Sequence, residues 1–191
     1  LHESTRRQRQ MCIRDRVFCA DLNRDRLAGQ LHGVENFDTD YVEALLIATV
    51  DAALVLQNVA LAAESHGLGI CMIGAIRIHP KAVGKLLNLP PLVYAVAGLC
   101  LGYPAKDQQQ KPRLPLETIL HHEQYSEDNQ QIGHIKGYDQ TMVEFYSSQA
   151  MHDKDPRWSK VMAARTARFH ERAELDEYLS DQGFHFKSST P

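Results

Sequence analysis

The hydrophobic positions of this chain fall into three short runs and one long stretch. The runs Val17–Asp21, Leu68–Ile73 and Tyr94–Leu101 have the length of buried strands, and the last is uninterrupted, as in an interior strand. Between the first two runs lies Tyr41–His66, which is rich in Ala and Leu and lacks Gly and Pro, so it predicts a long helix. This order predicts an α/β or α+β protein with a mixed sheet.

The long predicted helix has recognisable ends and an apolar surface on almost every side. Asp40 is placed to cap its start, and Gly67 occupies the position after its end, where a left-handed residue is favoured. The polar interruptions near its middle are Thr49, Asp51, Gln57 and Asn58. A helix that is apolar all round is buried all round. We therefore expect a second subunit to cover one face, the alternative being a central core helix of a monomer.

Weaker patterns predict the remaining elements. Asn23–Asp40 is expected to be loop with some helix. Pro80 fits the first position of a short helix that ends at Asn88, with Val83, Leu86 and Leu87 turned inward. The other expectations are a short strand within Glu117–Tyr125 and helices at His134–Ser148 and Pro156–Leu179.

The first sixteen residues differ from the rest of the chain. They carry five arginines and no hydrophobic period, which fits either a basic arm that touches nucleic acid or a non-native segment. We expect a non-native or disordered arm at 1–16, one domain at 17–186 and a short tail at 187–191.

Composition narrows the class of protein. A net charge of −3 gives no reason to expect nucleic acid or a membrane surface as a partner. The four cysteines form no CxxC pair and read as buried thiols in a reducing compartment. No uninterrupted apolar run approaches the ~20 residues of a membrane span, and the start of the chain has no apolar signal-peptide core. We expect a cytoplasmic protein.

Two segments carry candidate binding chemistry. Met72-Ile73-Gly74-Ala75 ends a strand with small residues, so a planar ring could lie against its backbone; a plain turn is the alternative. Lys111-Pro112-Arg113 holds two cations apart by one rigid residue, as an anionic group would need; a solvated basic loop is the alternative.

Other reaction chemistry has little support in the sequence. His121-His122-Glu123 resembles a metal site, but neighbours in a strand point to opposite faces, so we expect no metal. No GxSxG, P-loop or HExxH motif is present, and no nucleophile with a positioned base is predicted. We assign no catalytic side chain.

Taken together, AAESHGLGICMIGAIRIHPKAVGKLLNLP and VYAVAGLCLGYPAKDQQQKPRLP resemble the oxygen-insensitive NADPH nitroreductase and flavin reductase family. The resemblance covers about residues 17–186. It implies a homodimeric α+β fold with a mixed sheet flanked by helices, and the long helix at the dimer interface. It also implies an enzyme that binds FMN and passes hydride from NADPH to nitroaromatics, quinones or free flavin by a ping-pong cycle. The residues implied to bind the flavin are Met72, Ile73, Gly74, Ala75, Lys111, Pro112 and Arg113.

The chain departs from the family pattern in two places. Family members begin with a helical segment whose HRSIR-type motif holds the FMN phosphate, and Arg14 and Arg16 match it in neither type nor spacing. The family arginine before Trp158 that serves a nucleotide phosphate corresponds to Gln149, with Lys154 and Arg157 nearby. We therefore expect the N-terminal part of the domain to be absent. A non-catalytic fragment that keeps the dimerisation surface is the alternative function.

Overall fold

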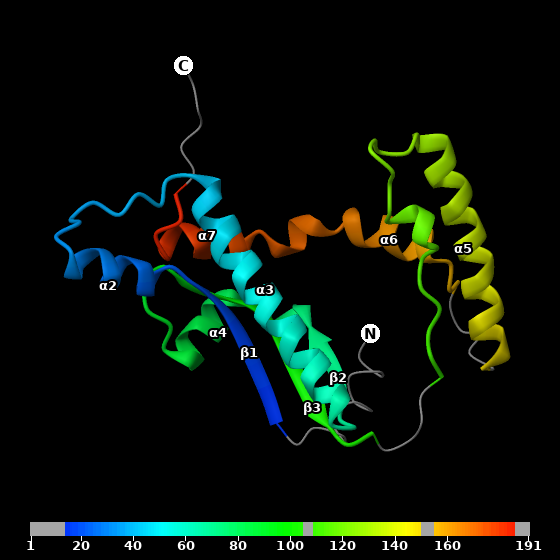
Figure 1. Cartoon of the computed structure of the whole chain (residues 1–191), viewed down its shortest axis with the longest axis horizontal. Coiled ribbons are helices and arrows are strands. Elements are labelled where there is room, and N and C mark those ends of the chain that lie inside the picture. The colour runs from blue at the N-terminus through cyan, green and yellow to red at the C-terminus, as the bar shows by residue number, and fades with distance from the viewer. Residues whose placement is uncertain (1–13, 105–108, 150–154, 186–191) are drawn as a thin grey trace. The chain divides into compact units, whose positions relative to one another are not determined.

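The computed structural model describes residues 14–104, 109–149 and 155–185. The chain divides into two compact units, one formed by the chain up to residue 107 together with the chain from residue 171, the other by residues 108–170. Figure 1 traces both, and each is described by itself below. The domain boundaries expected from the sequence stay a prediction.

The first unit is built on a three-stranded sheet with the order β1-β3-β2, formed by β1 (Arg14–Asp21), β2 (Gly69–Ile73) and β3 (Val93–Gly102). Both neighbouring pairs are antiparallel. The α+β class is confirmed, but the predicted mixed sheet is wrong for the described strands. Strands β1 and β2 do run the same way, as a helical crossover requires, and β3 inserts between them, so no parallel neighbours remain.

Strand β1 begins earlier than the hydrophobic pattern predicted. It starts at Arg14, which pairs with Leu101, and ends at Asp21, which pairs with Val93. The prediction began at Val17 because only apolar residues signal a strand in sequence, whereas backbone pairing with β3 carries the polar residues 14–16 into the ladder. Residues 1–13 of the expected arm lie outside the described residues.

Helix α3 (Val42–Ser65) confirms the long predicted helix. Its end is fixed by Gly67, whose φ of 73° is left-handed and whose N–H donates to the carbonyl of Glu64. The expected cap at Asp40 is wrong. The capping position is Tyr41, one residue later, and no side chain caps it.

One stripe of α3 is buried within the chain, rather than every side. The buried residues repeat at helical spacing and are Ala48, Ala52, Leu56, Ala60 and Ala63. Large apolar side chains on other sides are about half exposed: Val42, Leu46, Ile47, Val50, Leu54, Val55 and Leu61. Within the described residues α3 alone is long and apolar enough to cross a membrane, by length and composition only. The length of uninterrupted apolar runs does not reveal such a helix, because a helix tolerates isolated polar residues.

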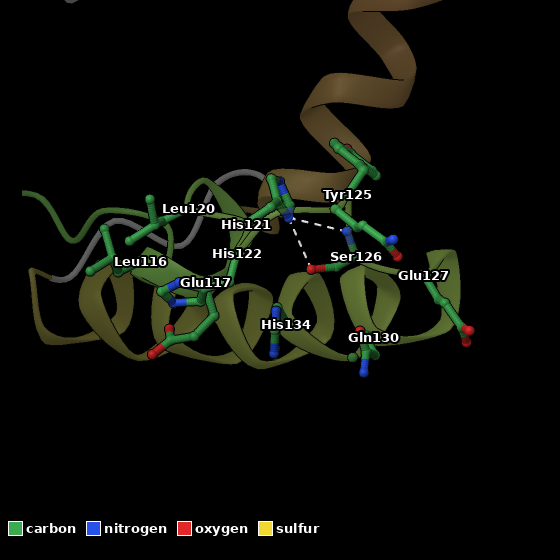
Figure 2. Close-up of a pocket in the computed structure, with 12 residues that line it drawn as sticks. Leu116, Glu117, Leu120, His121, His122, Tyr125, Ser126, Glu127, Gln130 and His134 are labelled. Atoms are coloured by element: carbon green, nitrogen blue, oxygen red, sulfur yellow. Dashed lines mark hydrogen bonds between the residues drawn. The ribbon is translucent and has the colours of Figure 1, made fainter.

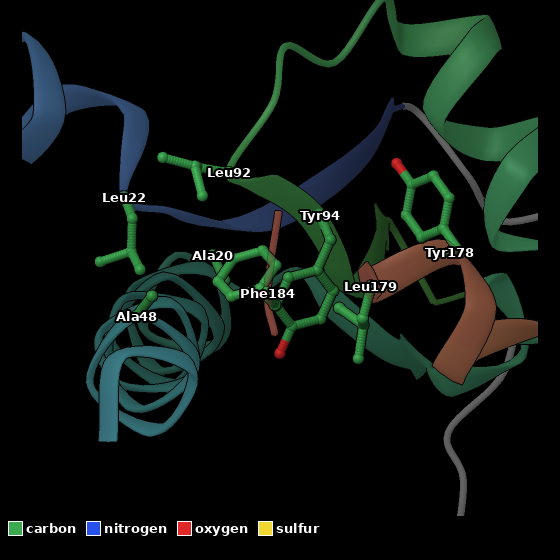
Figure 3. Close-up of a cluster of buried hydrophobic side chains, with 8 residues drawn as sticks. All are labelled: Ala20, Leu22, Ala48, Leu92, Tyr94, Tyr178, Leu179 and Phe184. Atoms are coloured by element: carbon green, nitrogen blue, oxygen red, sulfur yellow. The ribbon is translucent and has the colours of Figure 1, made fainter. Parts of the chain in front are cut away.

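The core of the first unit lies between α3, one end of the sheet and the C-terminal segment (Figure 3). Its buried side chains are Ala20, Leu22, Ala48, Leu92, Tyr94, Tyr178, Leu179 and Phe184. The rings of Tyr94 and Phe184 meet edge to face, with centroids 5.7 Å apart. Helix α7 (Glu174–Asp181) contributes two of these residues, so the end of the chain completes a core that begins in β1.

Short helices connect these elements. They are α2 (Asn23–Leu31), η1 (Gly74–Ile78) and α4 (Pro80–Leu87). Pro80 occupies the first turn of α4 as predicted, but the inward placement of Leu86 and Leu87 is wrong, since they are 83% and 40% exposed. The buried face of α4 instead presents Gly84, which lies against the ring of Tyr178. A glycine gives no hydrophobic signal in sequence, which explains the error.

The second unit contains η2 (Leu116–Thr118), α5 (Asp128–Ser148) and α6 (Trp158–Thr166). The strand predicted within 117–125 is wrong, because η2 occupies its start and Glu123 has a φ of 61°, which no extended strand accommodates. The helix predicted over 156–179 is broken into α6, η3 (Phe169–Arg172) and α7. Helix α6 packs on α5 and α7 packs in the first unit, so tertiary packing overrides local helix propensity.

Candidate functional site

The segment Met72–Ala75 lies at the end of β2, where the sequence placed it. Met72 and Ala75 are exposed, and Ile73 pairs with Gly98 as the last residue of the strand. Gly74 then begins η1. The segment therefore offers the exposed side chain of Met72 and the small, exposed Ala75 beside a half-buried Gly74 at a change of direction, which suits contact with a flat ring.

An arginine outside the set predicted from the sequence lies against this segment. Arg77, in η1, has a guanidinium nitrogen 3.4 Å from the position that a Cβ would take on Gly74. Its other terminal nitrogen donates to the carbonyl of Val96 in β3. The positive charge is therefore fixed beside the small residues. The sequence IGAIR contains the signal that could have identified Arg77. In a 3-10 helix residues three apart lie on the same side, so Arg77 lies beside Gly74.

The segment Lys111–Arg113 belongs to the second unit and presents both cations to solvent. The Lys111 ammonium lies 5.5 Å from the ring centroid of Tyr146, within cation–π range. The Arg113 guanidinium donates to the carbonyl of Lys111 at 3.2 Å. Both side chains are thus exposed and accessible to an anion.

Side chains of α5 and α6 hold this basic segment in place. The hydroxyl of Tyr138 donates to the carbonyl of Pro112 at 2.9 Å, and the Tyr138 ring meets Trp158 edge to face at 6.1 Å. Asp139 accepts the backbone N–H of Ser159 at 2.8 Å, which ties the start of α6 to α5. The rigidity inferred from Pro112 alone therefore also comes from a buried tyrosine that sequence reasoning did not find.

The seven predicted residues thus divide between the two compact units. Met72, Ile73, Gly74 and Ala75 are in the first, and Lys111, Pro112 and Arg113 are in the second. The first set offers small residues, an apolar side chain and the charge of Arg77. The second offers two exposed cations on a supported loop. Their assembly into one site stays a prediction.

Of the residues near the predicted nucleotide-phosphate position, Arg157 is already engaged. Its side chain donates to both carboxylate oxygens of Asp155, and the Lys160 ammonium lies 3.0 Å from the same carboxylate. These interactions hold the pKa of Asp155 well below its usual range, and the hydrogen bond from the Arg157 side chain has the largest effect. Gln149 donates to Gln109 at 3.1 Å. Lys154 lies outside the described residues.

A cavity of about 710 Å³ lies in the second unit between η2, the following loop and α5 (Figure 2). His121, His122 and His134 all line it, so the two adjacent histidines do not diverge as the strand prediction required. Nδ1 of His121 lies 2.9 Å from the hydroxyl of Ser126. No group of three potential metal ligands occurs in the described ranges. None of the seven predicted residues lines this cavity.

Comparison with known proteins places both units in one family. Residues 41–103 match the nitroreductase family, and residues 111–187 match the C-terminal domain of the nitroreductase family. The matched ranges contain all seven predicted residues.

Individual relatives give the same assignment. The chain is 37% identical over 169 residues to FMN reductase [NAD(P)H] of Bacillus subtilis, covering 88% of this chain and 68% of that protein. It is 38% identical over 168 residues to the oxygen-insensitive NADPH nitroreductase of Salmonella typhimurium, covering 88% and 67%. The solved structure of B. megaterium NfrA2 superposes with a TM-score of 0.85 at 36% identity, covering 91% of this chain and 70% of that one.

These likenesses define an α+β protein with the nitroreductase fold. The chain belongs to the nitroreductase family, a family of oxidoreductases. It spans about two thirds of the length of the curated relatives that it matches.

Proposed function

We propose that the protein is an FMN-dependent oxidoreductase that takes hydride from NADPH and passes two electrons to a nitroaromatic, a quinone or free flavin. The observation that carries this proposal is the 37–38% identity to an FMN reductase and an NADPH nitroreductase across both units. The ping-pong order, the cytoplasmic location and the acceptor classes rest on the family resemblance and belong to the same proposal.

The residues present fit an anionic, flat cofactor. A side chain on Gly74 would fill the space beside the Arg77 guanidinium, and Ala75 next to it is small and exposed. Lys111 and Arg113 are exposed cations of the type that pairs with phosphate or with a negatively charged ring. The donor set therefore matches FMN in charge, and the small residues match it in shape.

FMN, when bound, would supply the hydride chemistry, and the chain would bind, orient and tune it. Gly74 and Ala75 would admit the ring to the backbone at the end of β2, and Met72 would cover it with an apolar side chain. Lys111 and Arg113 would stabilise negative charge on the ring or the phosphate. The absence of an assigned acid or base side chain is consistent with this division of work.

We further propose that α3 forms the interface of a homodimer. Its apolar side chains remain about half exposed in the single chain, including Leu46, Val50 and Leu54. These exposed apolar side chains form a second stripe along the 24-residue helix, distinct from the buried one. An exposed apolar stripe of this kind marks an interaction surface. A second copy of the chain would bury this stripe, in line with the burial on all sides expected from the sequence.

The cofactor proposal is tested by titrating the purified chain with FMN and following flavin fluorescence. Lys111→Ala with Arg113→Ala removes two charge-assisted contacts. Each contact is taken to contribute about 1.5 kcal/mol, the low end for a charged hydrogen bond, because both cations are exposed. Loss of both contacts should therefore raise the Kd of FMN about a hundredfold. The matched control is Lys136→Ala with Arg165→Ala, two exposed cations elsewhere in the second unit, which should leave the Kd unchanged. Equal Kd values for both pairs, or a chain that binds no FMN, would contradict the proposal.

The interface proposal is tested by sedimentation of a charged variant. Leu54→Glu places a carboxylate in the exposed stripe of α3 and should shift the protein from dimer to monomer. Leu86→Glu is the control, since Leu86 is 83% exposed on α4 and lies outside the stripe. A chain that is monomeric before substitution, or a Leu54→Glu variant that stays dimeric, would exclude α3 as the interface.

A further inference from the structure

The chain that leads into the basic segment of the second unit runs along α5. The side-chain amide of Gln149, just after α5, donates to Gln109 at 3.1 Å, and the hydroxyl of Tyr138 donates to the carbonyl of Pro112 at 2.9 Å. The earlier residue of the segment thus meets the end of the helix, and the later residue meets its middle. Residues 109–112 therefore run in the opposite direction to α5 and are held at both ends.

One face of α5 lies between these two contacts. Tyr138, Met142 and Tyr146 follow one another at intervals of four residues, which places them on the same side of a helix. Tyr138 and Met142 are buried, whereas Tyr146 is half-buried. The ring of Tyr146 is therefore the aromatic surface of this face that stays partly open.

This ring restrains the side chain of Lys111. The Lys111 ammonium lies 5.5 Å from the centroid of the Tyr146 ring, within cation–π range. None of the ion pairs among residues 14–104, 109–149 and 155–185 involves Lys111. An ammonium carries three donor hydrogens, so a ring on one side leaves donors for an anion on another. The Lys111 side chain is exposed, and an anion can therefore reach it while the ring contact persists.

We propose that Tyr146 is a positioning residue that orders the Lys111 ammonium before FMN binds. This inference rests on the proposed function, in which Lys111 binds negative charge on FMN, and Tyr146 acts through Lys111. A lysine side chain that is already ordered loses less rotamer freedom when the anion arrives. Without the ring, ordering this one side chain should weaken FMN binding about two- to tenfold.

The test is a double-mutant cycle on the full chain, with the Kd of FMN measured by flavin fluorescence. Tyr146→Leu removes the ring and should raise the Kd about two- to tenfold. Lys111→Met removes the charge and should raise the Kd at least as much. The variant with both substitutions should bind FMN as Lys111→Met does, because the ring has no cation left to order. A merely structural role of Tyr146 would weaken binding in both backgrounds.

Two further variants separate the ring from its packing. Tyr146→Phe keeps the aromatic face and should retain the Kd of the parent chain. Tyr146→Met is a second variant without a ring and should match Tyr146→Leu, so that a packing defect in one of them does not decide the result.

The outcomes distinguish this inference from the proposed function. If the parent chain binds FMN and both ring-free variants keep its Kd, the role of Tyr146 is excluded and the proposed function stands. The same holds if Tyr146→Leu weakens binding equally with and without Lys111→Met, or if Tyr146→Phe weakens it as much as Tyr146→Leu. A parent chain that binds no FMN would overturn the proposed function, and the role of Tyr146 with it.

Discussion

Replacing Gly84 by alanine sets two physical effects against each other. In an exposed helix the change is favourable by about 1 kcal/mol, because glycine is a poor helix former. In α4, however, the new Cβ would clash with the hydroxyl oxygen of Tyr178 and lie 2.9 Å from the ring carbon that carries it. Tyr178 is 5% exposed and packs in the core, so it cannot move aside freely.

Overpacking of this kind costs about 1–3 kcal/mol, and full displacement of the ring would forfeit burial worth about 1.5–3 kcal/mol. The clash therefore outweighs the gain in helix propensity. We expect Gly84→Ala to lower the free energy of unfolding by about 1–2 kcal/mol, measured by urea denaturation with circular dichroism.

Two comparisons make this result specific. Gly137→Ala in α5 has nothing within 4 Å of the new Cβ and should stabilise by about 1 kcal/mol. Tyr178→Phe removes a buried hydroxyl that has no hydrogen-bond partner among the described residues, so it should be neutral or stabilising, and in the Gly84→Ala background it should recover about 1 kcal/mol. Stabilisation by Gly84→Ala alone would refute the packing of α7 on α4.

Three further results are expected. Leu99→Ala, at a fully buried position of the central strand, should destabilise by about 2–5 kcal/mol in the same urea assay. Asp139→Ala should cost about 1–2 kcal/mol and speed amide hydrogen exchange at the start of α6, because Ser159 loses its carboxylate acceptor. Burial raises the pKa of Tyr94 and outweighs the opposing effect of the Thr49 hydrogen bond. The contribution of Tyr94 to stability is therefore complete below pH about 10, the pKa of an unfolded tyrosine, and is lost as pH rises through the higher pKa of the folded state. Tyr94→Phe should flatten the alkaline fall in the urea midpoint.

The long helix and the central strand were predictable because their signals are local and strong. Tyr41–His66 differs from α3 by one residue at each end, and the left-handed Gly67 fixes its end as expected. Tyr94–Leu101 lies within the interior strand β3. Uninterrupted apolar runs and a helix-ending glycine depend little on the rest of the fold.

The errors arose where tertiary contacts or single backbone angles decide the outcome. The inward face of α4 is set by a glycine against Tyr178, and hydrophobic spacing cannot reveal such a contact. The positive φ of Glu123 prevents the strand expected around it. The antiparallel sheet follows from the insertion of β3 between two strands that run the same way, which depends on the order of strands in space.

The candidate site shows the same division. Small residues after β2 and a spaced cation pair were visible in the sequence as Gly74, Ala75, Lys111 and Arg113. Arg77 was missed because its role depends on a 3-10 turn that brings it back beside Gly74. The support of the basic loop by Tyr138 was missed because their hydrogen bond joins residues 26 positions apart.

We propose that this chain carries out FMN-dependent hydride transfer from NADPH. The most direct measurement is an anaerobic single-turnover experiment in which the chain, loaded with FMN and freed of excess, is mixed with NADPH while flavin and NADPH absorbance are followed together. We predict loss of the oxidised flavin band with one NADPH consumed per bound FMN, and return of the band when a quinone is added after the NADP product is removed. Two results would contradict the proposed function. One is a chain that retains no FMN, and the other is a bound flavin that stays oxidised after NADPH is added.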